Sequence, residues 1–165
     1  TCYSFSAHKT RNFLNLFLAM NDIQEAYEDI EDMYLKFTKQ YMTITDDTMD
    51  VSLRQHTSIY SFFCAVLTHA KDELNEAEAE FDFLEATERE RKRTELQGAG
   101  LKATDRALDA YLKTVASLRQ QACIVRLRTR KQNLAKNLVS SLDHQKDMLV
   151  QMSANKRAEI KLHEL

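Results

Sequence analysis

The chain has 165 residues, which suits one domain with a hydrophobic core of its own, and it carries a net charge of −2. It contains no proline, no tryptophan and only two glycines, while helix-forming residues dominate, so a β-protein would lack residues for its tight turns. The composition therefore argues against a sheet protein and predicts an all-α fold, a small helical domain with long amphipathic helices.

The start of the chain carries a short apolar run, FLNLFLAM, at residues 13–20. It is far too short to cross a bilayer, and no cleavage pattern follows it, so we expect neither membrane insertion nor secretion. Met20 opens an acidic stretch suited to a cytoplasmic helix. One hypothesis is that residues 1–19 are a non-native upstream extension of the reading frame or are disordered, which leaves residues 20–165 as a single helical domain.

The first predicted helix begins near Ile23. Apolar residues recur there every three or four positions, as on one face of an amphipathic helix: Ile23, Tyr27, Ile30, Tyr34, Phe37 and Tyr41. This pattern stops between Thr43 and Thr57, where short polar residues compete for backbone hydrogen bonds, so we expect a connecting loop. Ser58 is a suitable N-cap for the next helix.

The second predicted helix has the spacing of a seam packed against another long helix. The seam consists of Ile59, Phe63, Val66, Ala70, Leu74, Ala77, Phe81 and Leu84. Beyond Leu84 the stripe positions become charged, so we expect the last turns to reach solvent. Gly98 and Gly100 then break the helical pattern.

The rest of the chain is predicted to form a short helix capped by Thr104, followed by a long helix from about residue 116 to 161. About 45 residues at roughly 1.5 Å each give nearly 70 Å, more than a domain of this size covers. A leucine-rich stripe of coiled-coil character therefore predicts oligomerisation through this helix: Leu134, Leu138, Leu142, Leu149 and Met152.

No constellation for catalysis or metal binding is found in the sequence. The paired carboxylates lie in solvated stretches, and the five histidines are scattered. Cys2, Cys64 and Cys123 are odd in number and far apart, which fits a reducing compartment and no disulfide framework. No nucleotide-binding or nucleophile motif occurs. We expect a cytoplasmic protein that is not an enzyme and needs no cofactor.

Two basic clusters are the main functional signal. Arginine forks match phosphate oxygens, and neutralised phosphates release counterions, so two clusters on separate helices favour nucleic-acid binding. A solvated helix face is the alternative for either cluster alone. No aromatic residue is interleaved, which predicts weak sequence preference. The candidate DNA-binding residues are Arg89, Arg91, Lys92, Arg93, Arg126, Arg128, Arg130 and Lys131.

The order of these features resembles the UvsY family of phage recombination mediators. The resemblance covers about residues 20–160 and rests on layout: the acidic first helix, the connector TDDTMDVSLRQHTSIYS, the second helix ending in a basic segment before a glycine loop, LKATDRALDAYLKT, and the tail HQKDMLVQMSANKRAE. One departure is that residues 73–85 are strongly acidic, so DNA could approach only the end of the second helix and not the whole of it.

The resemblance implies a small helical protein that assembles into rings, binds single-stranded DNA, and helps load a RecA-like recombinase in place of single-stranded-DNA-binding protein. It would act in the host cytoplasm if phage-encoded. The family's DNA-contacting segment would fall on Arg89, Arg91, Lys92 and Arg93, and its assembly helix on the tail. The sequence does not give the copy number, the recombinase or the path of the DNA.

Two other interpretations remain open from sequence. The first is a helical structural or adaptor protein, such as a phage assembly factor, in which the basic tail of one subunit pairs with the acidic front of another. The second is a basic amphipathic helix on an anionic membrane. It is disfavoured because the tail lacks the Trp and Phe that such helices place at the interface.

Overall fold

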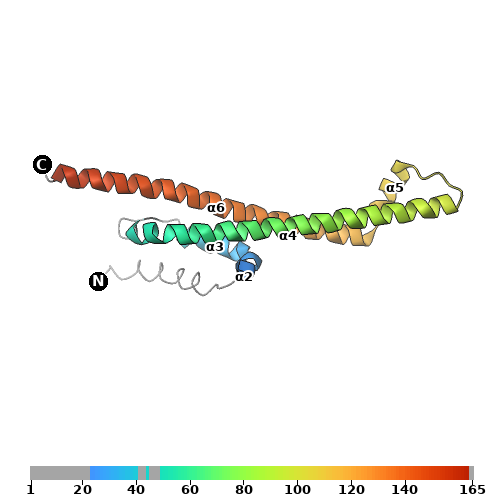
Figure 1. Cartoon of the computed structure of the whole chain (residues 1–165), viewed down its shortest axis with the longest axis horizontal. Coiled ribbons are helices and arrows are strands. Elements are labelled where there is room, and N and C mark those ends of the chain that lie inside the picture. The colour runs from blue at the N-terminus through green and yellow to red at the C-terminus, as the bar shows by residue number, and fades with distance from the viewer. Residues whose placement is uncertain (1–22, 41–43, 45–48, 164–165) are drawn as a thin grey trace. The chain divides into compact units, whose positions relative to one another are not determined.

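A computed structural model describes residues 23–40, 44 and 49–163. The described chain forms helices α2 (Ile23–Glu28), α3 (Ile30–Gln40), α4 (Met49–Gly98), α5 (Asp105–Leu112) and α6 (Ala116–His163), and no strand occurs in these ranges (Figure 1). The all-α fold with long helices is therefore confirmed. The proposed upstream extension, residues 1–19, lies outside the described residues.

The chain divides into two compact units, each considered by itself below. Unit 1 takes residues up to 69 and from 133 onward, and unit 2 takes residues 70–132. The long helices α4 and α6 each contribute to both units. The single helical domain expected over residues 20–165 stays a prediction.

The core of unit 1 is built from α2, α3, the first part of α4 and the second part of α6. Tyr27, Phe37 and Phe63 have no exposed surface, and the rings of Phe37 and Phe63 meet edge to face at 5.4 Å. Tyr27 meets His69 at 5.1 Å in the same geometry. His69 Nε2 also lies 2.5 Å from Gln24 Oε1, so this partly buried histidine has a polar partner beside the aromatic core.

Unit 2 packs the second part of α4 against α5 and the first part of α6. Its buried apolar side chains include Leu74, Ala77, Leu108, Leu112 and Leu118. The buried amide of Gln121 donates to the carbonyl oxygen of Ala77 at 3.2 Å and to Glu80 at 3.0 Å. These bonds satisfy the polar group and fix α6 beside α4.

Helix α4 begins nine residues before the N-cap predicted at Ser58. The expected loop is therefore wrong over residues 49–57, where the chain is helical from Met49. The reason is that polar side chains continue the buried stripe: Met49, Ser52, His56 and Ile59 follow one another at helical spacing and are all buried. Because Ser52 and His56 are polar, the apolar periodicity of the sequence does not include them.

The first predicted helix is divided at Asp29 into α2 and α3, although hydrogen bonds from Asp29 N to Glu25 O and from Met33 N to Asp29 O cross the division.

Thr104 caps α5 as predicted, accepting a bond from Ala107 N at 3.3 Å. The chain then turns between Leu112 and Ala116.

Gly98 and Gly100 end α4 as the sequence predicts. Leu101 N donates to Leu96 O at 2.8 Å and Gly100 N donates to Gln97 O at 2.9 Å, which is the hydrogen-bond pattern of a Schellman cap. Gly100 has a φ of 70°, a left-handed conformation that favours glycine. No helix in the described part of the chain is both long and apolar enough to cross a membrane.

Candidate nucleic-acid interface

All eight predicted DNA-binding residues belong to unit 2. The α4 basic segment, defined as Arg89, Arg91, Lys92 and Arg93, lies on the last turns of α4. The other four predicted residues lie on the first half of α6. The two groups differ in their partners.

Arg89 and Arg91 of the α4 basic segment hold α5 against α4. Arg89 donates to Asp109 at 2.8 Å and to Glu85 at 3.2 Å. Arg91 donates to Glu88 at 2.6 Å and also to the hydroxyl of Tyr111. Tyr111 in turn donates to Glu88 at 2.7 Å. These contacts join α4 to α5.

The remaining two cations of the α4 basic segment pair along their own helix. Lys92 donates to Glu95 at 2.7 Å, and Arg93 donates to Glu90 at 2.7 Å. Lys92 also lies over the ring of Tyr111, 5.2 Å from its centroid, in a cation–π contact. Every cation of the segment therefore has a carboxylate partner.

The electrostatics of the α4 basic segment follow from these pairs. Residues 85–95 hold four carboxylates, on Glu85, Glu88, Glu90 and Glu95, beside the four cations, so the stretch has no formal net charge. Hydrogen bonds to Asp109 and then Glu85 raise the pKa of Arg89, and hydrogen bonds to Tyr111 and then Glu88 raise the pKa of Arg91. The segment therefore carries individual charges, but its net charge of zero gives it little attraction for a distant phosphate.

The first half of α6 differs from the α4 basic segment in its net charge, because it contains no acidic residue. Residues 110–142 hold seven Lys and Arg and no Asp or Glu. Arg119 donates to the carbonyl oxygen of Thr114 at 2.8 Å. Arg126 donates to the carbonyl oxygen of Ala122 at 3.3 Å and to Cys123 Sγ at 3.2 Å. Within the described residues, neither arginine has a carboxylate partner.

Three exposed arginines share one side of α6, and we call Arg119, Arg126 and Arg130 the α6 basic stripe. Arg126 and Arg130 follow Arg119 by seven and eleven positions, close to two and three full turns at about 3.6 residues per turn. The stripe spans about 17 Å at roughly 1.5 Å per residue. It therefore offers guanidinium groups along a line.

The four α6 residues predicted from the sequence do not share one face. Arg128 pairs with Glu73 of α4 at 2.9 Å and is turned toward that helix, while Lys131 is half-buried. Arg119 is not among the candidate residues predicted from the sequence, yet it begins the exposed stripe. The spacing of seven residues between Arg119 and Arg126 is the signal that identifies it.

A cavity of about 360 Å³ lies among α4, α5 and α6 in unit 2, next to the α6 basic stripe. Its apolar part includes Phe81, Leu112 and Leu118, and its polar part includes Glu85, Asp109 and Arg119. Leu112 and Leu118 are buried, whereas Arg119 is exposed. Arg119 therefore belongs to both the cavity and the stripe.

The predicted oligomerisation residues lie in unit 1. Leu138, Leu142 and Leu149 are 0%, 0% and 1% exposed, and Leu134 and Met152 are half-buried. The three buried leucines belong to the core of one chain, where α6 packs with α4. Their assignment to an interface between copies stays a prediction.

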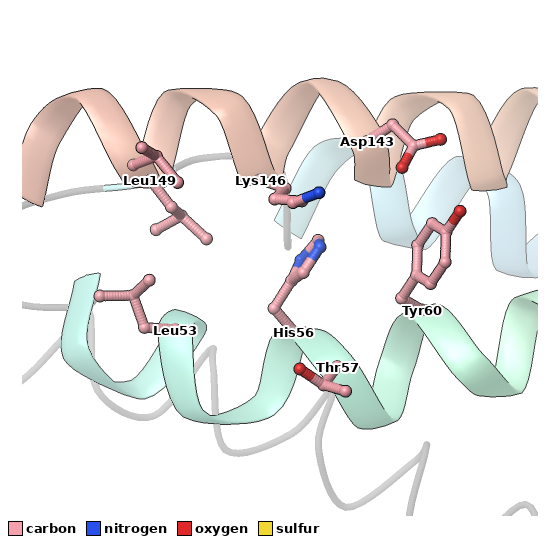
Figure 2. A pocket seen from close by; sticks show the side chains of 8 residues that line it. Leu53, His56, Thr57, Tyr60, Asp143, Lys146 and Leu149 are labelled. Atoms are coloured by element: carbon pink, nitrogen blue, oxygen red, sulfur yellow. The ribbon is translucent and has the colours of Figure 1, made fainter.

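A second cavity, of about 390 Å³, lies between α4 and α6 within unit 1 (Figure 2). His56 reaches from α4 toward Lys146 of α6, and Tyr60 points toward Asp143. His56 Nδ1 is buried and has no hydrogen-bond partner in the described structure. Negative charge on Cys64 and then Asp143 raises the pKa of Tyr60. This cavity contains none of the predicted DNA-binding residues.

No three side chains of His, Cys, Asp or Glu in the described residues are placed to hold a metal ion. No protein-family model, no curated protein and no solved structure matches this chain. The resemblance to the UvsY family therefore stays a prediction, as does the absence of a cofactor.

Proposed function

We propose that this protein binds single-stranded DNA along the α6 basic stripe and acts without covalent chemistry. The observation that carries the proposal is the charge of the first half of α6. Seven cations occur between residues 110 and 142 without one acidic residue, and the exposed Arg119 and Arg126 have only uncharged partners among the described residues. Such guanidinium groups can exchange weak local bonds for phosphate oxygens.

The acidic part of α4 limits where the DNA lies. Asp72, Glu76, Glu78 and Asp82 are exposed on the α4 half of unit 2 and repel phosphates. A strand that follows the α6 basic stripe keeps to the α6 side. The binding site of one chain is consequently narrow, and its affinity is modest.

The resemblance to the UvsY family extends the proposal to a biological role. In that role the protein is a homo-oligomer, a ring of repeated stripes, and avidity multiplies the weak affinity of each copy. It holds DNA, weakens the contacts of single-stranded-DNA-binding protein, and presents the strand to a RecA-like recombinase. The expected partners are therefore single-stranded DNA, single-stranded-DNA-binding protein, a RecA-like recombinase and further copies of the chain.

The proposal is tested by titrating labelled single-stranded DNA of mixed sequence at several salt concentrations, with duplex of the same length as competitor. We expect binding that prefers the single strand and a linear fall of log affinity with log salt. Absence of binding at low salt would contradict the proposal.

A helical adaptor protein is the second candidate function. It is favoured by the ion pairs that already join helices of this chain, Arg89 with Asp109 and Arg128 with Glu73. The same chemistry between copies would let the basic tail of one subunit bind the acidic front of another. In that case the oligomer dissociates as salt rises, whereas an assembly held by apolar contacts persists.

A further inference from the structure

We propose that the unit 2 cavity beside Arg119 binds a single unpaired nucleobase, with guanine favoured over thymine. This inference rests on the proposed function and adds a site for a base to a site for phosphates. It is carried by three features of the cavity: an apolar floor, a rim on which two carboxylates lie beside Arg89 and Lys113, and an arginine shared with the α6 basic stripe.

The floor and rim of the cavity match the two surfaces of a base. Bases have apolar faces that stack on aromatic and aliphatic side chains and edges that form hydrogen bonds. Phe81, which is half-buried, and the buried Leu118 supply apolar surface, while Glu85 and Asp109 supply acceptors at the rim. The volume of about 360 Å³ falls within the range of about 300–1,000 Å³ typical of small-molecule sites.

Arg119 places the cavity on the path of the strand. It is exposed, it lines the cavity, and it begins the α6 basic stripe. A phosphate bound at Arg119 brings its own base to the mouth of the cavity. Only a base that is free of a complementary strand can turn inward, so the cavity also favours single strands over duplex.

The rim carboxylates select among the bases. Arg89 donates to both Asp109 and Glu85, at 2.8 and 3.2 Å, and so holds two acceptors in place. A carboxylate has two oxygens and can accept two parallel bonds. Guanine presents adjacent N1–H and N2–H donors on one edge. In thymine the single N3–H lies between two carbonyl oxygens, which a carboxylate repels.

The test compares a thymine-only oligonucleotide with one of the same length that carries guanine at every fifth position. This spacing avoids runs of guanine. We expect the unmodified protein to bind the guanine-containing strand about tenfold more tightly, near the lower end of the discrimination of a good bidentate contact. Both strands should show the same dependence on salt.

The decisive variant is Ala122→Leu, which fills the cavity and leaves every charge in place, since Ala122 lines it. Leucine is a good helix former, so α6 is retained, and circular dichroism checks this. We expect equal affinity for the two strands. Ala158→Leu, at an exposed position of the same helix, is the matched control and should keep the preference.

The outcomes separate this inference from the proposed function. Equal affinity of the unmodified protein for both strands, with a steep salt dependence, overturns the base site and leaves DNA binding intact. A preference for guanine that survives Ala122→Leu in a folded protein also overturns it. Absence of binding to either strand overturns the proposed function and the base site together.

Discussion

The basic clusters of α4 and α6 each carry four cations within six positions, yet the partners of these cations differ. On α4, carboxylates of the same helix and of α5 pair with Arg89, Arg91, Lys92 and Arg93. On α6, Arg128 pairs with Glu73 of α4, whereas Arg126 and the nearby Arg119 bond to carbonyl oxygens and a thiol. The comparison teaches that a basic cluster is a candidate for phosphate binding only when the residues one turn away leave its charge uncompensated.

The largest expected effect comes from removing charge on α6. Arg119→Ala combined with Arg126→Ala should weaken single-stranded DNA binding by about 30-fold, or about 1 kcal/mol for each phosphate contact. Fluorescence anisotropy at low salt measures the change. If the affinity falls less than about twofold while the protein stays folded, the phosphate site lies elsewhere.

A gain of binding is expected when the α4 carboxylates are neutralised. Glu90→Gln and Glu95→Gln remove the partners of Arg93 and Lys92 and leave the contacts with α5 in place. Residues 85–95 then carry a net charge of about +2, and Arg93 and Lys92 lose their carboxylate partners and become available to phosphates, which together should raise DNA affinity by about three- to fivefold. Unchanged affinity in the same titration would contradict the view that these carboxylates keep the α4 basic segment from binding DNA.

A smaller effect on DNA binding is expected when cations of the α4 basic segment are removed. Arg91→Ala combined with Arg93→Ala should change DNA affinity by less than about threefold, because these side chains are paired within the chain and their loss acts only at a distance. The titration used for the α6 variant provides the direct comparison. A loss as large as that of the α6 variant would restore α4 as the phosphate site.

The smallest expected effect concerns stability. Asp109→Asn weakens the link between Arg89 and α5, and the side chain of Asp109 is 55% exposed. Exposed ion pairs contribute about 0–1 kcal/mol, so the free energy of unfolding should fall by less than about 1 kcal/mol. Urea denaturation measures it. A loss above about 2 kcal/mol would mean that α5 depends on this contact far more than its exposure indicates.

Much of the fold could be predicted because it depends on local signals. The caps at Thr104 and Gly100, the turn before Ala116 and the uninterrupted α6 all follow from residue type and spacing. The start of α4 could not, because Ser52 and His56 complete its buried stripe with polar groups that resemble a loop in sequence.

The candidate site was harder to predict than the fold. Its cations were visible in the sequence, but their partners depend on tertiary structure, as with Asp109 and Tyr111 of α5, which lie twenty positions from Arg89 and Arg91. The face of each α6 cation also depends on where α4 packs, which turns Arg128 toward Glu73. The cavity beside Arg119 is lined by residues of three helices, so the sequence of any one helix does not predict it.

The central claim is that phosphates bind to α6 and not to α4. The most direct measurement is the slope of log affinity against log salt for single-stranded DNA, compared among the unmodified protein, Arg119→Ala/Arg126→Ala and Arg91→Ala/Arg93→Ala. Each phosphate contact contributes about 0.7 to the slope on a single strand, so the α6 variant should lose about 1.4 and the α4 variant close to none. The reverse order, or equal losses in both variants, would contradict the account.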